Sequence, residues 1–326
     1  MIIIFLIFAV IFLVVTLILY KYCKGSENIR ENIDNIYENS PKLIIVHHGN
    51  KLPEYIDHFI DQAVVASPNT NIYFCLDENL KYETRHSNVN VINIGDIPKS
   101  TLTTSFENNS KLDKNFRDGF WHFCSKRFTT LYDFIKWKNF KHIFHMEYDN
   151  LLYVDLENLY NKMKNIDDYK NSAGIRDSEN QGVPSFMYFN DTSAIEKFAT
   201  FMTNNNFSND METICRFIQT GEMGTLPLLT KEYAKKLDLL KYEYLYKNED
   251  LLGCVFDGRS AGQFIGGIDP RNTEQTSTIG FINTDSLYNI SKLDVAFDKK
   301  NPMVCGVPIC NLHIHSKDLH LYKTNI

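Results

Sequence analysis

The chain lacks the features that mark nucleic-acid-binding and disordered proteins. It has no block of Lys and Arg, and its 34 basic residues are outnumbered by 40 acidic ones, which gives a formal net charge of -6. A mildly acidic chain offers phosphate polymers no electrostatic footprint, so we expect no nucleic-acid partner, although a small anionic ligand stays open. Hydrophobic residues make up 44% of the 326 residues, which predicts a globular protein with a sizeable core.

Cysteine motifs are also missing. None of the seven cysteines lies in a CxxC pair, and an odd number cannot all pair with one another, which argues against a zinc cluster. Cys75 and Cys124 lie in apolar patterns and are expected to be small core residues.

The N-terminal segment lacks charge altogether. Met1 to Tyr20 is apolar and long enough, as a helix, to cross a hydrocarbon layer of about 30 Å. A cleaved signal peptide is the alternative, but the segment has no basic start and no small-residue cleavage site. We therefore expect a single-pass membrane anchor at residues 1–21, a polar stem at 22–41 and one domain at 42–326. Lys21, Lys24 and Arg30 follow the span and favour a domain facing the cytosol, while the membrane itself, endomembrane or host, is left open.

The body of the chain alternates short apolar runs with helical patterns. Residues 42–48, 71–79 and 88–94 read as strands, and the segment that begins at Pro53 reads as a helix with one apolar face. A second helix is expected at residues 119–137, ahead of a strand that starts near His142. Strands that alternate with helices predict an α/β domain with a mostly parallel central sheet flanked by helices. No internal repeat or linker divides it.

Two acids follow the strand that starts near His142. Glu147 and Asp149 come directly after a buried apolar run, so they should lie at the carboxyl edge of the sheet, where ligands of open α/β sheets collect. Two carboxylates one residue apart can share a hard divalent cation. The alternative is an ordinary polar strand end, because acid-x-acid triplets are common.

A His-x-His-x-Lys motif near the C-terminus strengthens the metal hypothesis. In a strand His313, His315 and Lys317 would point the same way. One imidazole completes an oxygen-dominated site that suits Mn²⁺ better than Ca²⁺, and the lysine can neutralise phosphate. Core or surface histidines at a chain end are the alternative.

These two motifs resemble those of the GT-A superfamily of nucleotide-sugar glycosyltransferases. Glu147-Tyr148-Asp149 takes the place of the family's DxD triplet, and HIHSK, residues 313–317, takes the place of its C-terminal His and Lys. LIIVHHGN, SKRF and FDGRSAGQFIGGIDPRN match in order. The resemblance implies a GT-A-like domain that uses Mn²⁺ or Mg²⁺ to move a sugar from a UDP- or GDP-sugar donor to a hydroxyl acceptor, which is a glycan, lipid or protein. The first acid departs from the family, because it is Glu and not Asp.

The resemblance also implies roles for individual residues. Asp149 and His315 would be the main metal ligands, with Glu147 and His313 as further candidates. The residues expected to bind the nucleotide and its diphosphate are His47, Gly49, Asn50, Asp77, Lys126, Arg127, Glu147 and Lys317. For the basic pair Lys126-Arg127 the alternative is that both side chains are solvated at the surface. For the residues after the first two strands the alternative is that they cap those strands.

The acceptor hydroxyl needs an acid on the far side of the sugar. Asp257 is the first candidate, because its segment lies between the two metal motifs, and Asp269, Glu212 and Asp210 are weaker ones. Each could instead cap a helix.

Two other functions stay open. A nucleotidyltransferase would usually carry a Gly-rich basic phosphate loop, which HHGNKLPEY does not provide. A non-catalytic, membrane-tethered protein that binds sugars or nucleotides would tolerate Glu at the first acid.

Overall fold

The computed structural model describes residues 39–205, 207–272 and 278–324. The predicted anchor at 1–21 and residues 22–38 of the predicted stem lie outside these ranges. By its internal contacts the chain divides into Met1–Ser40 and the unit Pro41–Ile326, which carries both the acid triplet and the histidine motif. Within the described ranges, no helix combines the length and the apolar character that a membrane span requires.

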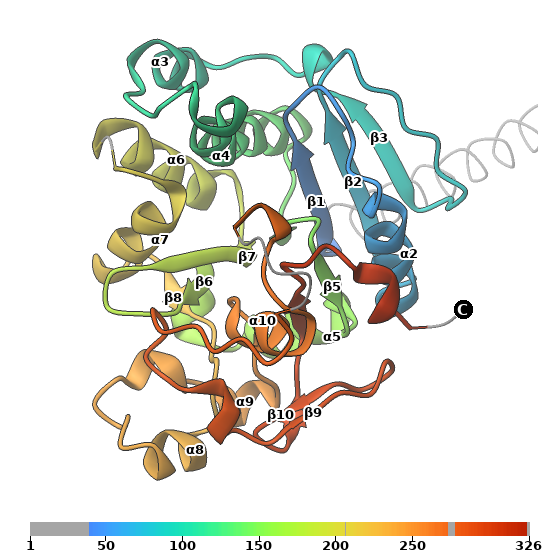
Figure 1. Cartoon of the computed structure of the whole chain (residues 1–326). Coiled ribbons are helices and arrows are strands. Elements are labelled where there is room, and N and C mark those ends of the chain that lie inside the picture. The colour runs from blue at the N-terminus through green and yellow to red at the C-terminus, as the bar shows by residue number, and fades with distance from the viewer. Residues whose placement is uncertain (1–38, 206, 273–277, 325–326) are drawn as a thin grey trace, which may run out of the picture. The chain divides into compact units, whose positions relative to one another are not determined.

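A seven-stranded sheet forms the centre of the unit Pro41–Ile326 (Figure 1). Its strands, in spatial order, are β3 (Val89–Asn93), β2 (Asn71–Leu76), β1 (Lys42–His47), β4 (Ile143–Met146), β7 (Gly182–Phe189), β6 (Ser172–Arg176) and β8 (Gly224–Thr225). All neighbouring pairs in this order are parallel except the two that involve β7, which runs antiparallel to both β4 and β6. The predicted α/β fold with a mostly parallel sheet is therefore confirmed.

Alternate residues of the central strands face two separate hydrophobic cores. In β1, Leu43 and Ile45 pack into one core, while Ile44 and Val46 pack into the other. This is the expected result when a strand with a continuous apolar run is covered on both faces. Helices α2 (Ile56–Ala66) and α5 (Leu156–Met163) contribute to the first core. Helices α3 (Thr101–Asn109), α4 (Phe120–Lys138), α6 (Thr192–Asn205) and α7 (Asp210–Gln219) contribute to the second, and α3, α4 and α6 lie side by side in Figure 1.

The long helix α4 is held by the large apolar residues of its middle turns. Phe128, Leu131, Phe134 and Ile135 are fully buried. The helix stops at Asn139, which adopts the left-handed conformation (φ 53°) typical of a helix C-terminus. The prediction of a helix at 119–137 thus agrees with the structure within one residue at each end.

A small two-stranded sheet joins distant parts of the chain. The strand β5 (Asn150–Leu152) pairs antiparallel with β12 (Asn311–His313), and the register sets Asn150 opposite His313. The sequence did not predict β5, which begins only three residues after Glu147. This pairing brings the C-terminal motif beside the turn that carries the two acids.

Further elements cover the first core below the sheet in Figure 1. They are α8 (Lys231–Lys236), α9 (Glu249–Leu252), α10 (Ser260–Gly266) and a three-stranded sheet of β9 (Val295–Ala296), β10 (Met303–Val304) and β11 (Val307–Pro308). Helix α10 lies within the Gly-rich segment 258–272.

Candidate active site

The two acids lie on the turn between β4 and β5. Strand β4 ends at Met146, and the backbone N–H of Asn150 donates to the carbonyl of Glu147 (3.2 Å), which closes the turn. The side chains of Glu147 and Asp149 are 19% and 15% exposed, so both carboxylates are partly shielded from water while still reachable. The acids therefore lie at the carboxyl end of a central strand, where the sequence located them.

His313 completes a cluster with these acids. Its Nε2 atom is 3.3 Å from Oδ1 of Asp149 and 3.8 Å from Oε2 of Glu147. Its Nδ1 atom donates to the carbonyl of Gly258 (2.6 Å), which fixes the ring so that Nε2 faces the acids. One ligand atom from each of Glu147, Asp149 and His313 can be chosen so that all lie within 4.8 Å of one another, close enough to hold one metal ion.

Charge pairing dominates the protonation of this cluster. Burial lowers the pKa of His313, but the Asp149 and Glu147 carboxylates outweigh it and raise that pKa to about 9. Burial raises the pKa of Asp149, but Lys317 and His313 outweigh it and hold the pKa well below its usual range. The ammonium of Lys317 is paired with Oδ2 of Asp149. At neutral pH the acids therefore face two cations, and a metal ion would have to displace the proton of His313.

His315 lies behind His313 and does not reach the acids. The two imidazole rings are 4.1 Å apart between centroids, but β12 ends at His313 and His315 lies in the turn that follows, so the predicted strand does not extend to His315. Nδ1 of His315 is 3.3 Å from Nε2 of Gln263, and its Nε2 has no hydrogen-bond partner among the described residues. Burial, followed by His313 and Lys317, lowers the pKa of this imidazole, which is neutral. The geometry thus corrects the expectation that His315 is the main imidazole ligand and favours His313.

Arg127 is also placed differently from the prediction. Its guanidinium is 7% exposed and donates to Oε1 of Glu147 (2.7 Å) and to Oδ2 of Asp210 (2.6 Å). Both ends of the fork are thus occupied by carboxylates, and no free phosphate clamp is formed. Arg127 instead orients Glu147, whose second oxygen faces His313. The neighbouring Lys126 pairs with Glu107 of α3 (3.0 Å).

The predicted nucleotide-binding residues after β1 and β2 form a capped loop. Asp77 accepts from the backbone N–H of Gly49 (2.8 Å) and lies 2.9 Å from Nδ1 of His48. Nε2 of His48 lies 3.0 Å from the hydroxyl of Thr130 in α4. Asp77 therefore has the strand-capping role that was the alternative, and His48 is a partner that the sequence analysis missed, although it adjoins His47.

His47 is the residue of this group that is left available for a ligand. It is buried, its ring is 5.2 Å from that of Tyr148 between centroids, and neither ring nitrogen has a hydrogen-bond partner within the described part of the chain. Asn50 is exposed and lies farther along the loop. The structure thus brings His47 next to the acid turn through Tyr148.

Asp257 has a structural position. Its carboxylate accepts from the backbone N–H groups of Ala261 (3.0 Å), Gly262 (2.8 Å) and His313 (3.0 Å), so it caps α10 and holds β12. Burial raises its pKa to about 6 despite these three bonds. With both oxygens engaged, Asp257 positions His313 and is not placed to accept a proton from an acceptor. This corrects its assignment as the first catalytic candidate.

The weaker acceptor-side candidates differ in their surroundings. Glu212 accepts from the backbone and hydroxyl of Ser208 (3.1 and 2.7 Å) at the start of α7, which is the helix-cap alternative. Asp269 is buried, and its oxygens accept from the backbone and guanidinium of Arg271. Burial raises the pKa of Asp269, but Arg271, with Lys317 contributing, outweighs it and lowers that pKa. Asp269 is therefore an ionised acid at the margin of the cluster.

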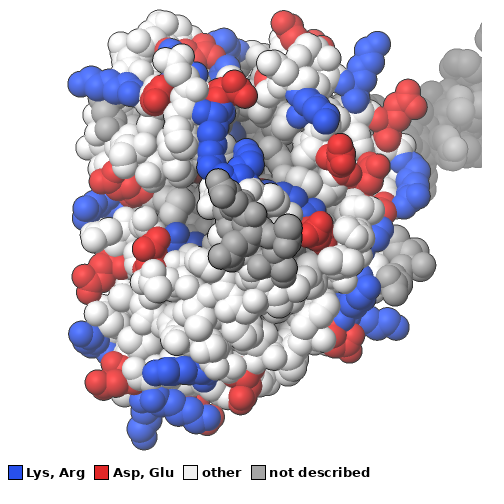
Figure 2. All heavy atoms as spheres, in the orientation of Figure 1, with Lys and Arg blue, Asp and Glu red and all other residues white. Residues whose placement is uncertain are grey.

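Basic side chains gather around the region in front of α4. Figure 2 shows Lys and Arg in the upper middle of the viewed face, where α4 lies in Figure 1.

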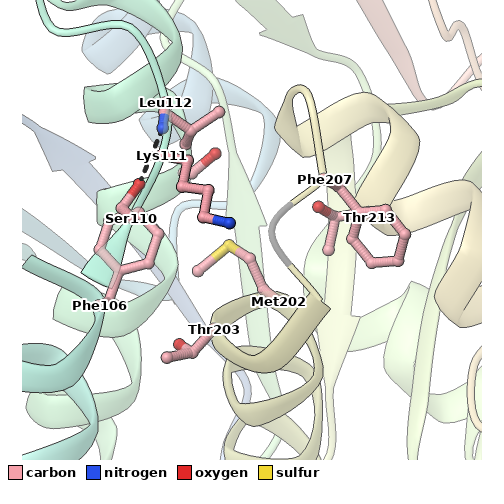
Figure 3. Close-up of a pocket in the computed structure, with 9 residues that line it drawn as sticks. Phe106, Ser110, Lys111, Leu112, Met202, Thr203, Phe207 and Thr213 are labelled. Carbon is pink, nitrogen blue, oxygen red and sulfur yellow. Dashed lines mark hydrogen bonds between the residues drawn. The ribbon is translucent and has the colours of Figure 1, made fainter.

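A separate pocket between α3, α6 and the start of α7 is lined by apolar and hydroxyl side chains and one lysine (Figure 3). Its lining includes no carboxylate or imidazole, so it cannot supply the metal chemistry of the acid cluster. Those lining residues are Phe106, Ser110, Lys111, Leu112, Ser125, Met202, Thr203, Phe207 and Thr213.

Two comparisons by sequence find no counterpart for the chain. No protein-family model matches it, and no curated protein sequence matches it either.

Two of the solved structures that match this chain are glycosyltransferases. One is the PaToxG glycosyltransferase, which is 10% identical over 72% of this chain and 87% of its own, with a TM-score of 0.37. Another is the apo form of mouse xyloside xylosyltransferase 1, which is 8% identical over 64% of this chain and 93% of its own, with a TM-score of 0.36. A likeness at these scores carries no argument about activity, so function rests on the residues of the site.

Proposed function

We propose that this chain is a metal-dependent glycosyltransferase that moves a sugar from a nucleoside-diphosphate sugar, a UDP- or GDP-sugar, to a hydroxyl acceptor. One observation carries the proposal. Glu147, Asp149 and His313 converge at the carboxyl end of a central strand, with the ammonium of Lys317 against Asp149. Paired acids, an imidazole and a lysine at this edge suit a metal-bound diphosphate.

The donor set fits Mn²⁺ or Mg²⁺. Two carboxylates supply hard oxygen ligands, and the imidazole nitrogen favours Mn²⁺ over Ca²⁺. The hydrogen bond from His313 to Gly258 is the kind of supporting contact that orients a metal-binding histidine. When bound, such an ion would neutralise the negative charge that develops on the departing nucleoside diphosphate.

The chain's own residues would prepare the site for this chemistry. Arg127 holds Glu147 through one oxygen and leaves the other facing His313. Asp257 fixes the backbone of His313. Lys317 would supply positive charge to the diphosphate, which requires its release from Asp149. Among the acceptor-side candidates, Asp269 is the one whose charge is coupled to Lys317, and it would have to act while paired with Arg271.

Donor hydrolysis tests the proposed function. The full-length chain would be assayed with UDP- and GDP-sugars for release of the nucleoside diphosphate, with and without Mn²⁺. Asp149→Asn should lose Mn²⁺-dependent release by roughly 100-fold or more, since it removes a charge-bearing ligand. Asp298→Asn, at an exposed position, is the matched control.

The alternatives give different results in the same assay. Donor binding by the full-length chain without hydrolysis or transfer would show a binding protein. Release of pyrophosphate from nucleoside triphosphates would show a nucleotidyltransferase. Normal release by Asp149→Asn would contradict the metal assignment.

The membrane anchor is a separate part of the proposal. We propose that residues 1–21 span a membrane once and tether the domain there, as the uncharged run from Met1 to Tyr20 indicates. Protease treatment of intact membranes that carry the tagged chain tests the orientation, because digestion without detergent means that the domain faces the accessible side.

A further inference from the structure

We propose that Cys254 and Cys310 form a disulfide bond that links the segment of Asp257 to the segment of His313. This modification is independent of the proposed sugar transfer. It concerns two buried cysteines, 5% and 1% exposed, that the site chemistry does not use.

Backbone hydrogen bonds hold the two cysteines on neighbouring segments. Val255 and Ile309 form a parallel bridge, in which the N–H of Val255 donates to Pro308 (3.0 Å) and the N–H of Cys310 donates to Val255 (2.8 Å). Cys254 lies one residue before one bridge position, and Cys310 lies one residue after the other. The bridge keeps the two segments side by side, and the two cysteine side chains meet diagonally across it.

The two sulfur atoms are already close to bonding distance. Sγ of Cys254 is 2.7 Å from Sγ of Cys310. A disulfide has a sulfur–sulfur distance of about 2.05 Å, so closure requires a movement of only ~0.6 Å. Both residues belong to the first hydrophobic core.

Formation needs a disulfide donor such as glutathione disulfide. The Cys254 thiolate attacks a sulfur of the donor, which forms a mixed disulfide and releases one glutathione thiolate. The Cys310 thiolate then attacks Sγ of Cys254 and releases the second. The protein loses two protons and two electrons, and the donor gains them as two thiols. Because both cysteines are buried, the exchange takes place before the domain has closed around them.

The bond would stabilise the part of the domain that supports the site. It closes a loop between residues 56 positions apart and lies three residues before both Asp257 and His313. Since a cross-link of this length restricts the unfolded chain, it should raise the melting temperature. A stable disulfide also requires an oxidising compartment, which would place the domain on the lumenal or outer side, opposite to the side that Lys21, Lys24 and Arg30 favour.

Thiol mapping tests the proposal without any assay of activity. The full-length chain would be produced through a secretory membrane, purified without reductant and incubated with glutathione disulfide. It would then be denatured with N-ethylmaleimide and mapped by peptide mass. We expect the peptides of Cys254 and Cys310 to be linked and two hydrogens lighter than the free thiols, while Cys75 and Cys215 are alkylated.

Thermal unfolding provides the second measurement. Reduction should lower the melting temperature of the parent chain by on the order of 5–10 °C. The double variant Cys254→Ala/Cys310→Ala should show no such shift, whereas Cys305→Ala, a buried cysteine within the same loop, should retain it. Full alkylation of Cys254 and Cys310 without reduction would overturn the inference, and so would a linked peptide that contains Cys305.

Discussion

His313 and His315 show how one hydrogen bond separates two similar residues. His313 is buried and His315 is partly buried, and their rings are adjacent. His313 is held by Gly258 with Nε2 toward the acids, while Nδ1 of His315 faces Gln263. The chemistry of an imidazole as a ligand depends on which nitrogen faces the metal, and only His313 presents one to Glu147 and Asp149.

Substitution of each histidine tests this distinction. His313→Ala should weaken Mn²⁺ binding by roughly 10- to 100-fold or more, because it removes a ligand atom, while His315→Ala should change it much less. Isothermal titration of the full-length chain with Mn²⁺ measures both. A larger loss in His315→Ala would restore His315 as the ligand.

Arg127 provides a second prediction at the residue scale. Arg127→Met removes the charge between Glu147 and Asp210 and leaves two shielded carboxylates without their partner. The free energy of unfolding should fall by about 3–5 kcal/mol, which urea denaturation can measure. Lys126→Met is the control, since it breaks only the more exposed pair with Glu107 and should cost less than about 1 kcal/mol. Equal losses would argue against the bridging role.

At the scale of elements, the contact between α10 and β12 positions the site. Gly262 of α10 lies against the backbone of His313, so that an added Cβ would be only 2.0 Å from the carbonyl oxygen of His313. Asp257 ties the same two elements through its bonds to Gly262 and His313. Glycine is therefore required here for a close approach of backbone segments.

Gly262→Ala should separate these elements. The clash is with backbone atoms, so it cannot be relieved by a side-chain rotation, and we expect a loss of about 1–3 kcal/mol together with weaker Mn²⁺ binding. Denaturation and Mn²⁺ titration measure the two effects. Gly266→Ala in the same helix is the control, because its added Cβ would make an ordinary contact at 3.4 Å. Unchanged Mn²⁺ binding in Gly262→Ala would show that α10 does not position His313.

At the scale of the whole unit, one carboxylate fastens the C-terminal segment to α2. Asp61 accepts from Arg85 (2.8 Å) and Lys323 (3.2 Å) and lies 2.9 Å from Nε2 of His86. The C-terminal segment, red in Figure 1, lies beside α2 as a result. Burial raises the pKa of Asp61, but hydrogen bonds from His86, Lys323 and Arg85 outweigh it and lower that pKa below its usual value.

This pKa shift predicts how stability depends on pH. Because the folded carboxyl binds its proton less tightly than the unfolded one, Asp61 stabilises the fold above the unfolded pKa of about 3.9, and this contribution is lost as the pH falls through the lower, folded value. Asp61→Asn should therefore be less stable by about 1 kcal/mol at pH 7, since Arg85 is largely exposed, with the difference shrinking below about pH 4. Denaturation at several pH values measures this. Asp57→Asn, exposed on the same helix, should show a smaller difference, and a pH-independent deficit in Asp61→Asn would refute the linkage.

The sequence predicted the positions of helices and strands better than it predicted which residues contact one another. The strands at 42–48 and 142–146 and the helix at 119–137 were predictable, because each is a long or strongly apolar pattern that its own residues determine. The strand β5 was not, since three residues, Asn150–Leu152, carry too little pattern to separate them from a loop. Without β5, the pairing that sets His313 beside Asp149 could not be foreseen.

Charged residues were also harder to interpret than apolar ones. The sequence placed Arg127 and Asp257 near a ligand, but each is held by protein groups: Arg127 by two carboxylates and Asp257 by three backbone N–H groups. A residue that is free to bind a ligand and one that is held by buried protein groups can be of the same type in the sequence. Only the distances between groups in the folded structure distinguish the two roles.

The sequence by itself determined the α/β class and the acids at the carboxyl end of a central strand. These follow from local periodicity, which fixes where a side chain points relative to its own backbone. Tertiary structure decided which histidine meets Asp149, what Arg127 and Asp257 hold, and that Cys254 lies against Cys310. Those outcomes depend on the register between distant segments, such as the one that joins Asn150 to Asn311, 161 positions apart, and this register is set by packing and hydrogen bonding across the whole unit.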